Sequence, residues 1–151
     1  MSRHPLPPTA APSRGFTLLE LVIAMAVAAI LMTVALPSFA DALRRARRAE
    51  GTHALLQLQL AQERWRTDHP RYAAALSDIG LPGPTPNGHY QLAIASADDA
   101  GFVATATAAG VQAGDARCMV LKLEHRLGRT LRTSVDSGGV AADDQPNRCW
   151  Q

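Results

Sequence analysis

One apolar stretch near the amino terminus constrains this chain more than any other feature. Residues Phe16–Leu36 are 21 consecutive positions with a single charged side chain, Glu20. As an α-helix the stretch is about 31 Å long, which matches the hydrocarbon thickness of a bilayer. We therefore expect a helix that can span a membrane. Glu20 then needs a partner, because an unpaired carboxylate in hydrocarbon is costly.

The segment before this stretch differs from an ordinary secretory signal. Residues 1–15 contain four prolines and the cations Arg3 and Arg14, but no apolar run. The apolar stretch follows the expected cleavage point instead of preceding it, so cleavage would leave the anchor attached to the protein. We interpret residues 1–15 as a leader, residues 16–36 as the membrane-spanning half of a helix, and residues 37–68 as its second half.

The second half of the helix is predicted to be amphipathic. Pro37 removes a backbone hydrogen bond and crowds the preceding turn, so we expect a kink or local unwinding near residues 34–37. Helical patterning then resumes and continues to about Thr67, with an apolar face that needs a partner surface. That predicted face consists of Leu55, Leu58, Ala61 and Trp65, and the opposite face carries Gln57, Glu63, Arg64 and Arg66.

Residues 69–151 have the pattern of a small β domain. A loop rich in proline and glycine at residues 81–88 is followed by four runs typical of strands, separated by turn signals. A four-stranded antiparallel meander packed on the helix gives an α+β fold. The predicted strands are His89–Ala95, Phe102–Ala108, Cys118–Leu123 and Thr130–Val135, with turns at 98–101, 109–116 and 127–129.

Charge and cysteine content limit the possible functions. The chain has 15 basic and 13 acidic side chains, and removal of the leader arginines leaves 13 of each. A global basic field that would gather nucleic acid is therefore absent from the mature chain, although a local patch is possible. Cys118 and Cys149 would be free thiols in the cytosol. Beyond a membrane segment, in an oxidising compartment, we expect one disulfide, whose loop would contribute about 3–4 kcal/mol of stability.

The order of residues around the expected cleavage point carries the strongest functional signal. Gly15 precedes an aromatic residue, Phe16, and Glu20 follows within the apolar run. Cleavage after Gly15 would create an α-amine on Phe16. A neighbouring subunit shifted along the filament axis could bring that amine to Glu20, and the pairing would set the register of assembly.

The segment Gly15-Phe16-Thr17-Leu18-Leu19-Glu20 resembles the leader motif of type IV pilins and related pseudopilins. The resemblance implies that a prepilin peptidase cuts after Gly15 and N-methylates Phe16, that Glu20 is the assembly acid, and that Pro37 is the helix-breaking proline. It also implies the pilin fold, in which a long helix packs on an antiparallel sheet that ends in a C-terminal disulfide loop. No cofactor is implied.

The same resemblance implies a structural subunit, and not an enzyme. We expect a minor pilin of a type IV pilus that supports motility, adhesion or DNA uptake. Its expected partners are other pilin subunits, the prepilin peptidase, the inner-membrane assembly platform and, before assembly, membrane lipids. The precursor would cross the bacterial inner membrane once, with its C-terminal domain outside the cytoplasm, and then join a pilus at the cell surface. Two alternatives stay open: a DNA-binding competence pilin and a type II secretion pseudopilin, the latter expected to bind calcium and to lack the terminal disulfide.

Orientation in the membrane involves a conflict between two signals. Four arginines follow the apolar stretch, whereas two precede it, which reverses the usual excess of cations on the cytoplasmic side. The leader motif implies the opposite orientation, with the leader in the cytoplasm. The four arginines are Arg44, Arg45, Arg47 and Arg48.

Two groups of basic residues could bind anions. The arginines at 44–48 could hold lipid headgroups or DNA, but we favour a solvated face that pairs with Asp41 and Glu50 of neighbouring subunits. A second, diffuse group lies on the predicted sheet and its turns, where charge commonly serves solubility. Its members, taken as possible DNA contacts, are Arg117, Lys122, Arg126, Arg129 and Arg132.

We find no pattern typical of a metal site or an active site. The five histidines lack metal-ligand spacing, and the two cysteines are too far apart to form a CxxC arm. The paired aspartates at 98–99 and 143–144 lack the spacing of a calcium loop and are interpreted as turn residues.

Overall fold

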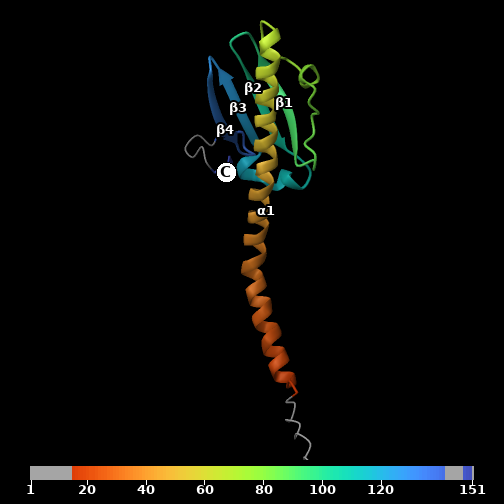
Figure 1. Cartoon of the computed structure of the whole chain (residues 1–151). Helices are drawn as coiled ribbons and strands as arrows, with labels where there is room; N and C mark the ends of the chain where they lie inside the picture. The colour runs from red at the N-terminus through yellow and green to blue at the C-terminus, as the bar shows by residue number, and fades with distance from the viewer. Residues whose placement is uncertain (1–14, 142–147, 151) are drawn as a thin grey trace, which may run out of the picture. The chain divides into compact units, whose positions relative to one another are not determined.

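A computed structural model describes residues 15–141 and 148–150, and it divides the chain into two compact units, Met1–Phe39 and Ala40–Gln151. A single helix, α1, covers Leu18–Asp68 and so contributes to both units. Each unit is described separately below. Figure 1 shows the helix together with the strands of the second unit.

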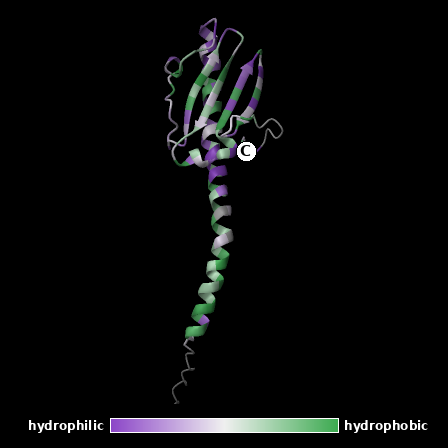
Figure 2. Cartoon of the chain, turned by 180° about the vertical axis from the view of Figure 1, so that it is seen from behind, coloured by the Kyte–Doolittle hydropathy of each residue, from purple (hydrophilic) through white to green (hydrophobic). Residues whose placement is uncertain are grey.

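The first unit is the apolar part of α1. Its large side chains are exposed in the single subunit, from 50% for Val27 to 86% for Phe16. The green ribbon in Figure 2 shows how continuous this apolar stretch is. The helix is long and apolar enough to cross a membrane. This expectation from the sequence is met by the length and composition of the helix.

The helical assignment of α1 continues through Pro37. Local unwinding at residues 34–37 is therefore not observed, because residues on both sides keep helical hydrogen bonding. Two hydroxyl groups in this region turn back onto the helix: Thr33 Oγ1 donates to the carbonyl of Ile30 at 2.7 Å, and Ser38 Oγ donates to the carbonyl of Ala35 at 2.8 Å. Such contacts often accompany bending. A kink at Pro37 stays a prediction.

The second unit contains the predicted four-stranded sheet. The strands are β1 (Tyr90–Ala97), β2 (Gly101–Ala108), β3 (Val120–Arg126) and β4 (Arg129–Val135), all antiparallel and in the order β1-β2-β3-β4. Alternation of buried and half-exposed residues along β2 and β3 produces one face that packs on the second half of α1, as Figure 1 shows. The α+β fold expected from the sequence is therefore confirmed.

Two tight turns define the register of the sheet. Between β1 and β2 the carboxylate of Asp98 accepts hydrogen bonds from the amides of Ala100 and Gly101, at 2.7 and 2.8 Å. These hydrogen bonds, assisted by Arg126, lower the pKa of Asp98. Between β3 and β4 only Leu127 and Gly128 form the loop, both with positive φ, which is typical of a type I′ hairpin.

The connection from β2 to β3 differs from the prediction. It contains two 3₁₀ turns, η2 (Gly110–Gly114) and η3 (Ala116–Cys118), where the sequence predicted a simple turn followed by a strand that starts at Cys118. Cys118 ends η3, and β3 begins two residues later at Val120. A short 3₁₀ turn, η1 (Leu76–Ile79), also precedes the loop at 81–88.

The helix face that packs on the sheet is rotated relative to the predicted one. Leu55 and Leu58 are fully buried as expected, but Ala61 and Trp65 are only half-buried. Gln62 is fully buried instead, because its side-chain amide both donates to and accepts from the backbone of Ala73, each at 2.8 Å. A polar side chain with both groups paired can take a core position.

The core lies between this helix face and the sheet. Tyr90, Leu121 and Leu123 are fully buried opposite Leu55 and Leu58. The helix lies close to the sheet at Gly51, where an added Cβ would be 3.0 Å from the Tyr90 ring and from Leu121. The buried small side chains of β2 allow the same close packing; they are Ala104, Ala106 and Ala108.

Candidate functional site: the helix start and an arginine-lined groove

The predicted cleavage point lies just before the start of α1. Gly15 and Phe16 are exposed and precede the first helical residue, Leu18. A Cβ added at Gly15 would meet no atom within 4 Å, so packing within the subunit does not require glycine there. An exposed, non-helical peptide bond is what a peptidase needs as a substrate.

Thr17 is the helix cap that the sequence analysis missed. Its hydroxyl Oγ1 accepts a hydrogen bond from the amide of Glu20 at 3.2 Å, and its carbonyl accepts one from Leu21 at 3.2 Å. A threonine followed three residues later by glutamate is a known helix-start pattern, so the residues 17–20 did carry the signal. Glu20 therefore lies in the first turn, exposed, where the helix dipole favours an anion.

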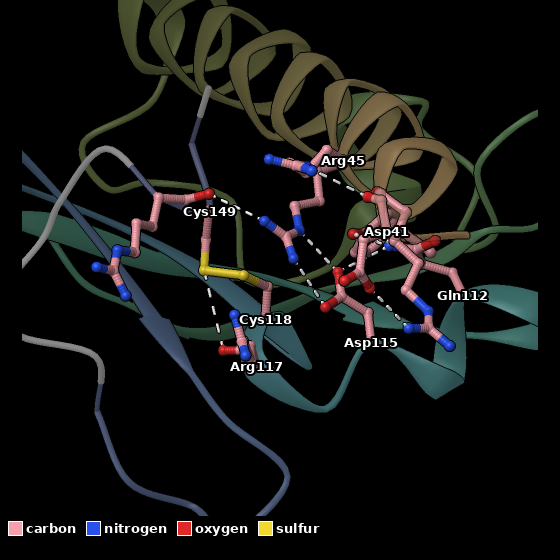
Figure 3. Close-up of polar contacts among 11 residues, drawn as sticks. Asp41, Arg45, Gln112, Asp115, Arg117, Cys118 and Cys149 are labelled. Atoms are coloured by element: carbon pink, nitrogen blue, oxygen red, sulfur yellow. Dashed lines mark hydrogen bonds and ion pairs between the residues drawn. A yellow bond between two sulfur atoms is a disulfide. The ribbon is translucent and has the colours of Figure 1, made fainter. Parts of the chain in front are cut away.

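The second candidate region is built around a buried arginine. Arg48 of α1 donates from Nε to Asp115 Oδ2 at 2.7 Å and from Nη2 to Asp115 Oδ1 at 2.9 Å. Its Nη1 donates to the carbonyl of Arg148 at 2.9 Å. Figure 3 shows this arrangement between the helix, the η2–η3 connection and the C-terminal segment. Arg48 thus joins three parts of the chain that are distant in sequence.

Gln112 extends the polar network around Asp115. Its amide nitrogen lies 3.0 Å from Asp115 Oδ2, 3.2 Å from the carbonyl of Arg44 and 3.3 Å from the hydroxyl of Tyr90. Burial raises the pKa of Tyr90, and the nearby Asp115 carboxylate acts in the same direction. All of these groups lie under the helix, so the network fixes how the η2 turn sits on α1.

The predicted role of the arginines at 44–48 is wrong for Arg48. It is a buried structural residue, and not part of a solvated face, because Asp115 neutralises it inside the domain. The proposed partners in neighbouring subunits, Asp41 and Glu50, also find partners within the chain. Asp41 pairs with Arg44 at 3.0 Å.

Glu50 accepts hydrogen bonds from the amide of Asn87 and from the ring of His89, at 3.1 and 2.5 Å. Burial alone would raise the pKa of Glu50. Hydrogen bonds from Thr85, Asn87 and His89 outweigh burial and lower the pKa to about 2. The carboxylate therefore ties α1 to the loop before β1.

The C-terminal segment is attached by the predicted disulfide. Cys118 and Cys149 are bonded, with their Cα atoms 5.7 Å apart. Next to the disulfide, Trp150 Nε1 donates to the carbonyl of Thr133 at 2.8 Å, and the Arg132 guanidinium lies 5.7 Å from the Trp150 ring centre. The disulfide starts from η3, and not from the third strand. The aspartates at 143–144, interpreted as turn residues, lie outside the described residues.

A groove of about 750 Å³ lies beside Arg48. Its cations come from three parts of the chain. These are the first turns of α1 within the second unit, the η3 turn and the C-terminal segment. Three aspartates also line it, and each has a partner: Asp41 binds Arg44, Asp115 binds Arg48, and Asp136 accepts the amides of its own turn. The arginines that line the groove are Arg44, Arg45, Arg48, Arg117 and Arg148.

The possible DNA contacts predicted from the sequence do not form one patch. Arg126 and Arg129 are cross-strand partners beside the β3–β4 turn, and Arg126 pairs with Asp98 at 3.3 Å. Lys122 lies within β3, 3.6 Å from Glu124. Arg117, in contrast, lies in η3 with the groove arginines. The sheet therefore separates residues that the sequence analysis grouped together.

Three of the described histidines, His69, His89 and His125, make structural contacts. His125 is buried, with Nδ1 3.0 Å from Thr130 Oγ1 and Nε2 3.3 Å from Glu63. His69 stacks on Trp65 with ring centres 3.6 Å apart. In residues 15–141 and 148–150, no group of three or more His, Cys, Asp or Glu side chains could hold a metal ion.

Comparisons with known proteins agree with this architecture. A family model described as "Type IV minor pilin ComP, DNA uptake sequence receptor" matches residues 37–122. A model described as "Prokaryotic N-terminal methylation motif" matches residues 11–36. Together the two models cover the predicted cleavage point, all of α1 and the sheet as far as the start of β3.

Two curated relatives are pilins. The type IV major pilin protein PilA of Myxococcus xanthus is 32% identical over 87 residues, which are 57% of this chain but only 40% of the relative. The type IV wide pilus major component PilA4 of Thermus thermophilus is 35% identical over 89 residues, 57% of this chain and 68% of the relative. The matched family models, the exposed apolar helix and the disulfide-closed sheet together show that the chain belongs to the type IV pilin family.

Proposed function

We propose that this chain is a minor structural subunit of a type IV pilus, inserted in the inner membrane as a precursor and then assembled through its N-terminal helix. The observation that carries the proposal is the exposure of the large apolar side chains between Phe16 and Leu36. So much apolar surface is stable only in lipid or against other apolar helices. A membrane-inserted precursor and a filament supply these two environments in turn.

Cleavage and assembly are proposed to depend on three residues at the helix start. A prepilin peptidase would cut between Gly15 and Phe16 and methylate the new amine. The carboxylate of Glu20 would then pair with the Phe16 amine of a neighbouring subunit. Support comes from the position of Glu20, which is exposed in the first helical turn and finds no ion-pair partner among the described residues. A carboxylate buried among apolar helices requires a cation.

Glu20→Ala tests the assembly step. We expect the variant to be cut and methylated like the unaltered chain, as measured by mass spectrometry of the new N-terminal peptide. We also expect it to be lost from sheared pili, because the register contact is missing. Glu63→Ala is the matched control on the same helix, since Glu63 lies in the second unit, and should enter pili normally. Normal amounts of the Glu20 variant in pili would refute the pairing.

Minor status rests on the matched family model, whereas both curated relatives are described as major components. The measurement that separates the two is the molar share of this chain in purified pili. A share of a few percent supports a minor pilin, and a dominant share would overturn that part of the proposal.

DNA uptake is the second candidate function, favoured by the description of the matched family model. Arg117 lies in the groove, whereas Arg126 and Arg129 lie at the β3–β4 turn, so two separate regions could contact phosphates. A gel-shift titration of the full chain in detergent, at two salt concentrations, tests this function. Binding to phosphates must weaken steeply with salt. Absence of a shift at low salt would exclude DNA binding by the subunit alone.

The type II secretion alternative is less well supported. The disulfide between Cys118 and Cys149 is the feature that we expected a pilus subunit to have and a pseudopilin to lack. The family model that matches residues 37–122 also describes a pilin.

A further inference from the structure

We propose that the groove beside Arg48 binds the phosphate of an anionic membrane lipid while the subunit is still in the bilayer. This inference rests on the proposed function, because it requires a membrane-inserted precursor. The residues that would contact the phosphate are Arg45, Arg117 and Arg148, with Arg44 and Arg48 as the supporting wall.

The first argument is the charge that remains after internal pairing. Five arginines and three aspartates line the groove, and two of the aspartates, Asp41 and Asp115, form ion pairs with Arg44 and Arg48. The third, Asp136, accepts hydrogen bonds from the amides of its own turn. Among the described residues, Arg45, Arg117 and Arg148 form no ion pair. Their side chains are exposed at the groove. The groove therefore has two more guanidinium groups than carboxylates, and this excess favours an anionic ligand.

The second argument is the construction of the groove wall. Arg48 is 9% exposed and is held at two points by Asp115, so it cannot turn away from the groove. The same guanidinium binds the carbonyl of Arg148, and the disulfide attaches the neighbouring Cys149 to η3. Figure 3 shows Arg45, Arg117 and the disulfide near Asp115, the ion-pair partner of Arg48. These contacts hold the backbone of the C-terminal segment beside α1 and η3, so the three parts of the chain that carry the arginines meet at one groove before any ligand arrives.

The third argument is position along the chain. Arg44 lies eight residues after Leu36, the last residue of the apolar stretch. The headgroup layer of a bilayer lies directly outside its hydrocarbon. Cations that follow a membrane span closely in the sequence attract the anionic headgroups of lipids. A lipid phosphate is therefore the anion that we expect these arginines to meet before assembly.

The fourth argument concerns the reversed charge distribution. Arginines that follow a membrane span on its outer side oppose the usual cytoplasmic excess of cations. Arg44 and Arg48 form ion pairs with Asp41 and Asp115, which leaves Arg45 as the groove arginine of α1 without an ion pair among the described residues. Guanidinium groups bind phosphate oxygens through parallel hydrogen bonds, which suits a phosphodiester headgroup.

The test uses the full chain purified in detergent and titrated with phosphatidylglycerol, with bound lipid counted by native mass spectrometry. The double variant Arg45→Gln/Arg117→Gln should bind about tenfold more weakly, because two cations are lost. The double variant Arg64→Gln/Arg129→Gln removes two exposed arginines outside the groove and should bind like the unaltered chain. Phosphatidylcholine, which has the phosphate but no net charge, should bind weakly to all three proteins.

Several results would overturn the proposal. One is equal lipid binding by the groove variant and the unaltered chain, and another is an equal loss in the control variant. A third is loss of DNA binding without loss of lipid binding: the groove variant no longer shifts a 20-base-pair DNA duplex in a gel, but it binds phosphatidylglycerol like the unaltered chain. That result would assign the groove to nucleic acid. Near-UV circular dichroism confirms that the variants keep their fold, as expected for exposed side chains.

The pilin function is tested separately, by measuring membrane insertion and entry into pili in strains that produce these variants. If the groove variant loses lipid binding but still enters the membrane and pili, the lipid site is confirmed without being essential for assembly. If the unaltered chain resists insertion, as measured by extraction with alkaline carbonate, the proposed function fails whatever the groove binds.

Discussion

The guanidinium of Arg48 and the carboxylate of Asp115 form a two-point pair, 2.7 and 2.9 Å long, across 67 positions of the sequence. Both side chains are buried. The pair connects α1 to the η2–η3 connection, and through the carbonyl of Arg148 it also reaches the C-terminal segment. One of the four arginines between residues 44 and 48 thus connects three segments of the second unit.

Replacing Arg48 by methionine should destabilise the head domain strongly. The change leaves the Asp115 carboxylate buried without its cation, which costs about 3–5 kcal/mol. Chemical unfolding of the full chain in detergent, followed by near-UV circular dichroism, measures the loss. Arg47→Met, one residue away and without a described ion pair, should change stability by less than about 1 kcal/mol. Similar losses for the two variants would contradict the structural role of Arg48.

Removal of the disulfide should lower stability without changing the sheet. Cys118 and Cys149 are 31 positions apart. Opening this loop raises the conformational entropy of the unfolded chain and lowers the free energy of unfolding by about 3–4 kcal/mol. We expect Cys118→Ser/Cys149→Ser to unfold at a lower denaturant concentration than the oxidised chain. Reduction of the unaltered chain by dithiothreitol should give the same shift. An unchanged midpoint after complete reduction, verified by thiol titration, would show that the bond contributes nothing.

Stability should fall in acid because of Glu50. Its pKa is lowered from 4.5 to about 2 in the folded protein, so the unfolded chain takes up the proton first as pH falls. The contribution of Glu50 is therefore complete above about pH 4.5 and is lost between pH 4.5 and 2. Its size is about 3 kcal/mol.

The matching measurement is the unfolding free energy of Glu50→Gln and of the unaltered chain across this pH range. The difference between them should shrink as pH falls, because the carboxylate of the unaltered chain becomes protonated. Glu124→Gln, on the exposed side of β3, should show a much smaller change. A constant difference for Glu50→Gln from pH 5 to pH 2 would mean that the carboxylate contacts do not stabilise the fold.

A side chain at Gly51 should push the helix away from the sheet. An added Cβ would lie 3.0 Å from the ring of Tyr90 and from Leu121, tighter than ordinary contact. Gly51→Val should therefore cost about 1–3 kcal/mol by overpacking. Ala49→Val, exposed on the same helix, corrects for the lower helix propensity of valine. If Gly51→Val is no worse than Ala49→Val, the helix and sheet can separate at no cost.

Much of the fold could be predicted from residue order alone. The apolar run after Gly15, the alternation in β2 and the turn at Leu127 and Gly128 each depend on neighbours a few positions apart. Periodicity reports such local preferences well. The disulfide between the two cysteines was also predicted correctly, from the oxidising compartment expected beyond a membrane segment.

Errors occurred where a distant residue changed the role of a local one. Trp65 fits the apolar spacing of the helix, but Gln62 takes the buried position because Ala73 pairs with both of its amide groups. Arg48 resembles its exposed neighbours in sequence, yet Asp115 draws it into the interior. The residues next to Ala73 and Asp115 in the sequence give no indication of these contacts.

The leader motif at Gly15 and Phe16, its acid at Glu20 and the strand pattern near Tyr90 followed from short-range chemistry, and that chemistry was enough to recognise the family. The groove did not follow from it. Arg45, Arg117 and Arg148 come together only when the helix, the η3 turn and the disulfide-bound segment pack around Arg48. The ion pair and the disulfide join residues that are far apart in the sequence. Only folding therefore brings these cations into one site.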